Sequence, residues 1–152
     1  MLKIRIIVGS LSTLALLTAF FYEYYLGYMP CDLCTYERIP YFLLIGISLI
    51  KNQKVFKNLS MFVLFCSIGI SVYHTQIESG VLPDSCAKKI KHSFSSADII
   101  KQINKVEKPS CGVVSTKIFD ISMSTWNALF SILLLVMIYL YSSYNLKTRN
   151  IK

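Results

Sequence analysis

The chain has 152 residues, a formal net charge of +8 and a mean hydropathy of +0.52, and 54% of its residues are hydrophobic. A soluble domain of this length needs a polar exterior as well as an apolar core. Here the apolar residues gather into long unbroken blocks, so the composition excludes an ordinary soluble domain and indicates an integral membrane protein.

Four apolar blocks follow one another along the chain. A helix that crosses a bilayer needs about 20 apolar residues, with roughly 17 to 25 tolerated. We predict transmembrane helices at about residues 6–26, 35–50, 59–76 and 123–144, in a single integral membrane domain that covers residues 1–152. The predicted fold class is therefore an all-α membrane protein, a four-transmembrane-helix bundle with a long extracytoplasmic loop between its third and fourth helices.

The first two blocks each allow a different interpretation. Residues 6–25 follow Lys3 and Arg5, as a secretory signal peptide would, but they end in bulky aromatic residues where a cleavage site needs small ones. The second block, residues 39–50, rises only about 18 Å as a helix, so it crosses the membrane only if the helix also takes in residues back to about Cys34. Pro40 lies inside that helix and should kink it.

The charges indicate an orientation. Residues 1–5, 51–58 and 145–152 together carry eight basic residues and no acidic residue, whereas the rest of the chain carries eight of each. Basic residues concentrate on the cytoplasmic side of membrane proteins. We therefore expect both termini in the cytoplasm and two outer loops, at about residues 26–36 and 77–122. No separate basic domain exists to bind nucleic acid, so we expect no nucleic-acid partner.

The second outer loop is predicted to be mostly irregular. A short amphipathic helix is predicted near residues 96–106, where Ile99, Ile100, Ile103 and Val106 recur at helical spacing. Such a segment would rest on the membrane surface.

Four of the five cysteines lie in the two outer loops. Cys31 and Cys34 lie in the first loop, Cys86 and Cys111 lie in the second, and Cys66 is alone inside the third block. An extracytoplasmic compartment lets disulfides form and persist. Cys66 is predicted to be a small buried apolar residue, because a free cysteine in apolar surroundings behaves in that way.

Cys31 and Cys34 are three residues apart, so their thiols can meet on one helical face. Pro30 favours the first turn of a helix, where free backbone N–H groups and the helix dipole stabilise a thiolate. A structural disulfide usually closes a longer loop, and a four-cysteine zinc site needs a second close pair, whereas 24 residues separate Cys86 from Cys111. We therefore predict redox chemistry and no metal site, with a structural disulfide as the alternative.

The second loop pair has different surroundings. Turn-forming residues flank Cys86 and Cys111, and no bulky residue shields them. We expect an exposed pair that a soluble partner can attack, whereas the pair at the helix entrance is within reach of a membrane-soluble electron acceptor. Two pairs placed in this way would form a relay from water to lipid.

Two further side chains are candidates for this site. Arg38 follows Cys34 by four residues, so we predict it one turn deeper on the same helical face, as a fixed charge near Cys34 and a donor to a quinone oxygen. The alternative is that Arg38 reaches the headgroups or pairs with Glu37. His74, near the outer end of the third block, could supply a second donor or a proton, or it could be a satisfied interfacial histidine.

The segment Pro30-Cys31-Asp32-Leu33-Cys34-Thr35-Tyr36-Glu37-Arg38 closely resembles the signature of the disulfide bond formation protein B (DsbB) family. Residues 73–75, the loop with Cys86 and Cys111, and residues 121–129 are also similar to that family, in one order over essentially the whole chain.

The resemblance implies a membrane thiol:quinone oxidoreductase of the bacterial inner membrane, which reoxidises a soluble periplasmic thioredoxin-fold thiol oxidase. By that resemblance Cys86 forms the mixed disulfide with the oxidase, Cys111 is its partner, and electrons pass to Cys31 and Cys34. Arg38 would hold the quinone, ubiquinone or menaquinone, with His74 and Met123 near it.

Two other classes remain open at this point. The vitamin K epoxide reductase-like family is another four-helix, quinone-linked thiol system, but by resemblance its active cysteine pair lies late in the chain. The other class is a non-enzymatic four-helix membrane protein with structural disulfides.

The lysine-rich second loop also differs from better-known DsbB relatives, so its partner-facing surface is expected to differ.

Overall fold

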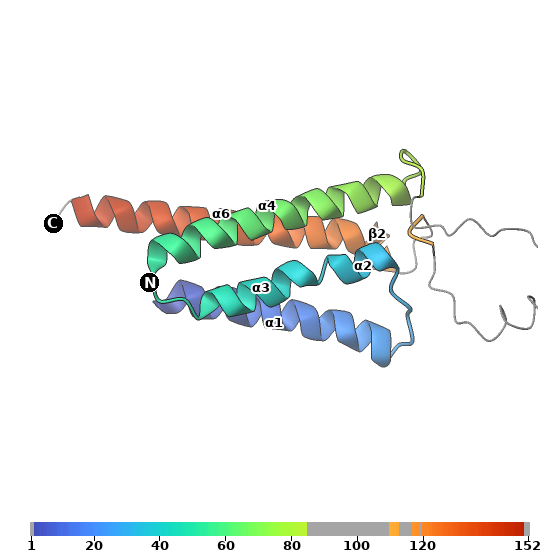
Figure 1. The fold of residues 1–152 in the computed structure, drawn as a ribbon, viewed down its shortest axis with the longest axis horizontal. Helices are drawn as coiled ribbons and strands as arrows, with labels where there is room; N and C mark the ends of the chain where they lie inside the picture. Colours follow the sequence, from blue (N-terminus) through green and yellow to red (C-terminus); the bar gives the residue numbers. More distant parts are fainter. Residues whose placement is uncertain (1, 85–109, 113–116, 119, 151–152) are drawn as a thin grey trace, which may run out of the picture.

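The computed structural model describes residues 2–84, 110–112, 117–118 and 120–150 (Figure 1). Its helices are α1 (Leu2–Tyr24), α2 (Asp32–Tyr36), α3 (Ile39–Ser48), α4 (Gln53–Glu78) and α6 (Met123–Asn150), and its strands are β1 (Lys117–Ile118) and β2 (Ile121–Ser122). The long helices run alternately up and down, with the two termini at one end and α2 at the other (Figure 1).

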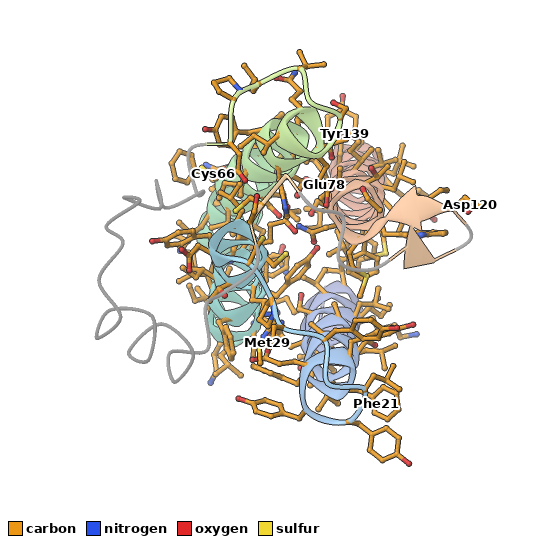
Figure 2. The ribbon with its side chains drawn as sticks, turned by 90° about the vertical axis from the view of Figure 1, so that its right-hand side faces the viewer. Phe21, Met29, Cys66, Glu78, Asp120 and Tyr139 are labelled. Atoms are coloured by element: carbon orange, nitrogen blue, oxygen red, sulfur yellow. The ribbon has the colours of Figure 1, made fainter. Side chains whose placement is uncertain are left out.

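The described helices have small polar residues inside and large apolar residues outside. The fully buried residues include the hydroxyl side chains of Ser12, Ser60, Ser67, Ser71, Ser124 and Ser131. The exposed residues include Phe62, Phe65, Leu133 and Leu140, and Figure 2 shows Phe21 and Tyr139 at the periphery. This distribution suits a lipid exterior, because helices in a membrane pack through small residues and gain nothing by hiding large apolar ones.

Three of the described helices are long and apolar enough to cross a membrane: Leu2–Tyr24, Gln53–Glu78 and Met123–Tyr144. They correspond to the first, third and fourth predicted spans, and α1 and α4 begin earlier in the chain than predicted. The protein is therefore mostly helical and passes through the membrane several times.

The second predicted span is not one helix. The prediction of a continuous helix over residues 35–50 was wrong, because α2 ends at Tyr36 and α3 begins at Ile39. Pro40 has no N–H to donate, and the amides of Tyr41 and Phe42 both bond to the carbonyl of Arg38, at 3.1 and 3.3 Å. The kink expected at Pro40 is thus a break, and α3 alone, about 15 Å long, is too short to cross the bilayer.

The helices pack as two neighbouring pairs, α1 with α3 and α4 with α6, and α3 joins the pairs through α4 (Figure 1). Their shared core includes Val8, Leu44 and Leu64, all fully buried. α1 and α3 approach closely at Gly9, where a Cβ atom would lie 2.8 Å from Ser48 Oγ. The absence of a side chain at Gly9 therefore sets the spacing of this pair.

A two-stranded ribbon precedes α6, so the prediction of an all-α chain needs one amendment. β1 and β2 are antiparallel and pair Ile118 with Ile121. Asp120, in the turn between them, has a φ of 61°, a left-handed conformation that aspartate tolerates better than most residues. The amphipathic helix predicted near residues 96–106 lies outside the described residues.

Candidate thiol redox site

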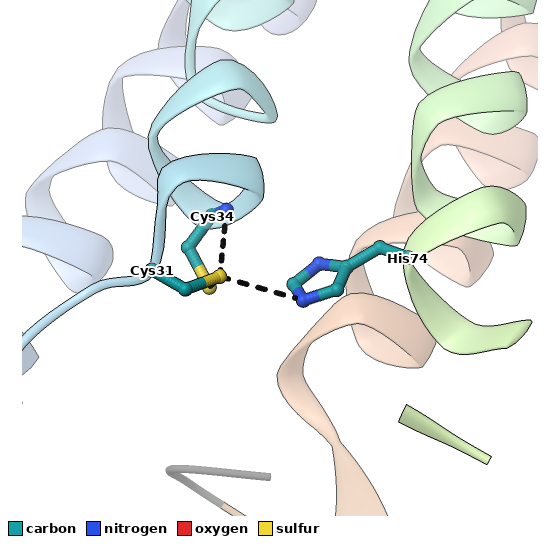
Figure 3. A group of neighbouring side chains, drawn as sticks. All are labelled: Cys31, Cys34 and His74. Atoms are coloured by element: carbon teal, nitrogen blue, oxygen red, sulfur yellow. Dashed lines mark hydrogen bonds between the residues drawn. The ribbon is translucent and has the colours of Figure 1, made fainter. Parts of the chain in front are cut away.

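The two cysteines of the first outer loop meet at the start of α2. Cys31 is the N-cap residue of this helix, and its Sγ accepts the backbone N–H of Cys34 at 3.3 Å. The two Sγ atoms are 3.0 Å apart and both cysteines are free (Figure 3). Cys31 is only 2% exposed and Cys34 is half-buried. The expected contact between the two thiols at a helix N-terminus is therefore present.

His74 reaches this pair from the last turns of α4. Its Nε2 lies 3.5 Å from Cys31 Sγ (Figure 3). Its Nδ1 lies 3.1 Å from Glu37 Oε1, and Glu78 Oε1 lies 3.7 Å from Nε2. His74 is only 1% exposed, so its ring is held between the carboxylates of Glu37 and Glu78 and a sulfur atom rather than at a lipid interface. This geometry gives His74 a place in the site.

The surroundings of Cys31 favour its thiolate. The hydrogen bond with the Cys34 side chain, and then the hydrogen bond with His74, lower the pKa of the Cys31 thiol from 9.0 to about 4, against the opposing effect of burial. The thiolate is the form that attacks disulfides and binds metals. At neutral pH, Cys31 therefore carries the negative charge of the pair.

Arg38 lines the same cavity as Cys34, and its ion pair is with a residue of α1 rather than with Glu37. It occupies the break between α2 and α3, where its guanidinium forms an ion pair with Glu23 of α1 and lies over the Phe20 ring, 5.1 Å from the centroid. Glu37 pairs with His74 instead of Arg38. The positive partner close to the Cys31 sulfur is thus His74, whereas Arg38 is held toward α1.

A cavity of about 370 Å³ lies beside the cysteines, within the range of small-molecule sites. All of the long helices and the α2–α3 segment contribute to its lining. The lining includes polar groups of Cys34, Arg38 and His74 and apolar side chains such as those of Leu14 and Phe130. Such a lining fits a flat apolar molecule that has polar atoms at its edge.

A hydrogen-bonded network joins α3 to α4 and α6 at this cavity. The Tyr41 hydroxyl donates to Asn127 Oδ1 and lies 3.2 Å from Ser131 Oγ. Asn127 Nδ2 donates to Ser71 Oγ at 2.7 Å. Since the low dielectric of a membrane makes unpaired polar groups costly, this network holds Tyr41 and Asn127 in place at the cavity wall.

The sequence analysis did not single out Glu23, Glu78 or Asn127. Glu78 is partly buried and accepts a hydrogen bond from Ser124, and Figure 2 shows it between the helices. For Glu23 a signal was available in the sequence, because it falls within the predicted first helix and acidic groups at membrane depth mark functional sites by default.

Cys111 lies against the first cysteine pair. It is disulfide-bonded, 1% exposed, and packs in one apolar cluster with Cys31 and Ile77. Asp84 Oδ2 accepts hydrogen bonds from the Gly112 amide at 3.0 Å and from Ser110, which holds this segment. The prediction of an exposed Cys111 was therefore wrong. Cys86 lies outside the described residues.

Cys66 also differs from its prediction. It is exposed on α4 instead of buried in the bundle (Figure 2). Its surroundings would be lipid, which is as apolar as a protein core, so the sequence pattern could not distinguish the two.

A helical membrane protein whose two thiols meet beside a cavity has the features of a membrane thiol redox protein. Residues 3–141 match the family described as Disulfide bond formation protein DsbB. The chain therefore belongs to the DsbB family, a family of membrane proteins of disulfide bond formation.

Two relatives accompany this match. The uncharacterized protein RP370 of Rickettsia prowazekii (strain Madrid E) is 33% identical over 142 residues, which cover 88% of this chain and 83% of that protein. A protein of Oceanobacillus iheyensis named as a probable disulfide formation protein is 34% identical over 68 residues, covering 43% of this chain and 47% of the relative. No solved structure matches the chain.

Proposed function

We propose that this protein is a thiol:quinone oxidoreductase that reoxidises a soluble periplasmic thioredoxin-fold dithiol oxidase, passes the electrons to a membrane quinone, and so supports disulfide formation in exported proteins. The single observation that carries this proposal is that the two cysteine centres share one buried cluster. Cys111 of the outer loop lies in the same apolar cluster as Cys31, whose partner Cys34 lines the cavity.

This shared cluster supports a complete path for thiol–disulfide exchange. The soluble oxidase, as a dithiol, reduces the Cys86–Cys111 disulfide and is itself oxidised. The Cys111 thiolate then attacks Cys31 of an oxidised Cys31–Cys34 pair, which breaks that disulfide and releases the Cys34 thiolate. Attack of Cys86 on Cys111 reforms the loop disulfide and releases Cys31. Two electrons have then moved from the loop to the pair beside the cavity.

His74 accepts a proton during this exchange. Its Nε2 lies 3.5 Å from Cys31 Sγ, and Nδ1 bonds to Glu37, which orients the ring and stabilises its charged form. Cys31 is the thiolate of the reduced pair, so the proton that it gives up can rest on His74. Glu78 borders the same ring nitrogen and extends the set of proton-accepting groups toward α6.

The residues around the cavity fit a quinone. Arg38 is a fixed cation that can donate to a ring oxygen, and the apolar walls of Leu14 and Phe130 suit a flat ring with an isoprenoid tail. A bound quinone, ubiquinone or menaquinone, supplies an acceptor for two electrons and two protons. Cys34, on the cavity lining, would then deliver the electrons, and His74, beside Cys31, would deliver protons.

The same arrangement supports a location in the bacterial inner membrane with both termini in the cytoplasm. The termini share one end of the bundle, and the cysteine site lies at the opposite end (Figure 1). The segments at the end with the termini carry the excess of basic residues. The site would then face the periplasm, where the soluble partner is found.

The test is to supply the purified protein with a reduced thioredoxin-fold oxidase and a quinone, and to follow quinone-dependent loss of thiols. Cys34→Ser should reduce the rate to background, because the pair can no longer cycle, whereas Cys66→Ser should keep the wild-type rate. Equal rates in the two variants would refute the proposed path. A glutathione titration separates the structural alternative, because a structural disulfide resists exchange that a relay pair undergoes readily.

A further inference from the structure

The reduced cysteine pair and His74 form a set of metal ligands that the sequence analysis did not assemble. The cysteine spacing argued against a zinc site of four cysteines, and no metal site was predicted. The fold instead brings Cys31 Sγ, Cys34 Sγ and a His74 ring nitrogen within 4.8 Å of one another. We propose that the dithiol form of this site binds one zinc ion through Cys31, Cys34 and His74. Two thiolates and one imidazole with an open fourth position are a known zinc ligand set.

The observed distances are close to those of a tetrahedral zinc site. Zinc–sulfur bonds of about 2.3 Å and zinc–nitrogen bonds of about 2.05 Å place S and N about 3.6 Å apart, and the two S atoms about 3.8 Å apart. Cys31 Sγ and His74 Nε2 are already 3.5 Å apart. The two sulfur atoms, at 3.0 Å, need to separate by about 0.8 Å, which a side-chain rotation of Cys34 can supply.

The surroundings of His74 are those of a zinc ligand. Zinc-bound histidines usually donate their other ring N–H to a carboxylate, which fixes the tautomer that leaves the first nitrogen free to bind. Glu37 Oε1 lies 3.1 Å from Nδ1 and so leaves Nε2 directed at Cys31. Glu78 Oε1, 3.7 Å from Nε2, provides an oxygen atom or holds a water molecule for the fourth position.

The charges also favour a divalent cation. The zinc-bound pair is dianionic, and Glu37 and Glu78 add two carboxylates beside His74. The guanidinium of Arg38 is ion-paired with Glu23 of α1, which offsets its positive charge. Binding would release the thiol proton of Cys34 and any proton held on His74 Nε2, because zinc takes thiolates and neutral imidazole as ligands.

Zinc at this site would hold the pair reduced. A sulfur lone pair shared with zinc is less available to attack a disulfide or to reduce an acceptor, so bound metal should slow oxidation of the pair. A disulfide offers no thiolate, so the oxidised site should bind no zinc. Binding itself needs no quinone and no soluble oxidase, and therefore does not depend on the proposed electron transfer.

The experiment uses the full chain in detergent micelles, reduced with a phosphine, in a Cys86→Ser/Cys111→Ser background that removes the loop thiols. Cobalt(II) is the spectroscopic probe, because its thiolate complexes absorb strongly, and zinc is then added to displace it. We expect one cobalt ion per chain, displaced by one zinc ion. The oxidised protein should give no thiolate–cobalt absorption.

Matched variants identify the ligands. Cys31→Ser and His74→Ala should each lose binding, Cys66→Ser should bind as the background does, and Glu37→Gln should weaken affinity by about 10- to 100-fold, as loss of a carboxylate behind a zinc-bound histidine typically does. Because Glu37 is not a ligand, its graded effect keeps the test valid if the His74 variant folds poorly. Absence of binding in the background, or unchanged binding in Cys31→Ser, would overturn the proposal.

Discussion

Replacement of His74 by alanine tests the electrostatics of the cysteine pair directly. The lost hydrogen bond joins the imidazole to the Cys31 sulfur, and a hydrogen bond to a charged group contributes about 1.5–3 kcal/mol. At 1.36 kcal/mol for a tenfold change in acidity, the pKa of Cys31 should rise from about 4 to about 5 or 6. It should stay well below 9.0, because the contact with Cys34, the larger cause, remains.

The sign of the effect follows from the lowered pKa. In the native protein Cys31 is a thiolate above pH of about 4 and loses its reactivity as the pH falls through that value. In the variant the loss begins at higher pH, so alkylation of Cys31 at a pH of about 5 should be about two- to tenfold slower.

The assay is alkylation of the reduced protein by iodoacetamide across pH, with a metal chelator present, and with the modified Cys31 counted by mass spectrometry of the peptide. Ser60→Ala is the matched control, since Ser60 is another buried polar residue of α4, distant in sequence from His74. An alkylation midpoint that is the same in His74→Ala and Ser60→Ala would refute the assignment of His74 as a partner of the Cys31 thiolate.

Two further predictions concern the cavity. Arg38→Ala should raise the quinone concentration needed for half-maximal rate by about tenfold or more, because it removes a charge-assisted donor, while thiol exchange at Cys86 with the soluble oxidase continues. Steady-state kinetics with varied quinone concentration measure this effect. An unchanged half-maximal concentration would mean that Arg38 serves only its ion pair with Glu23. Tyr41→Phe leaves Asn127 without its hydroxyl donor and should lower the free energy of unfolding by about 0.6–2 kcal/mol in mixed micelles, as membrane hydrogen bonds typically contribute. An unfolding curve that matches the wild type would show that the network carries no net stability.

Much of the architecture could be predicted because membranes impose strong local rules. A bilayer requires long apolar segments whose backbone groups are satisfied within each helix, so the helices now seen as α1, α4 and α6 were visible as uninterrupted apolar blocks. The cysteine pair was equally visible, since three-residue spacing brings Cys31 and Cys34 together in any helical turn.

The errors arose where position depends on partners distant in sequence. Whether residues 35–50 form one helix was decided by Pro40, whose missing N–H interrupts the helical hydrogen bonds between α2 and α3, and Arg38 at this break pairs with Glu23 of α1. The partner of Glu37 was decided by α4, which brings His74 to it. Turn residues around Cys111 suggested exposure, but Asp84 anchors that segment against the cysteine site.

By itself, then, the sequence determined the membrane class, the order of the spans and the chemistry of two outer cysteine pairs, because apolar length, charge placement and residue spacing act locally along the chain. Only the tertiary structure decided which groups stabilise the thiolate, where Arg38 lies and how Cys111 reaches Cys31. Those relations join residues up to about eighty positions apart, such as Cys31 and Cys111, and they arise from helix packing, which brings such residues together without leaving a local pattern in the sequence.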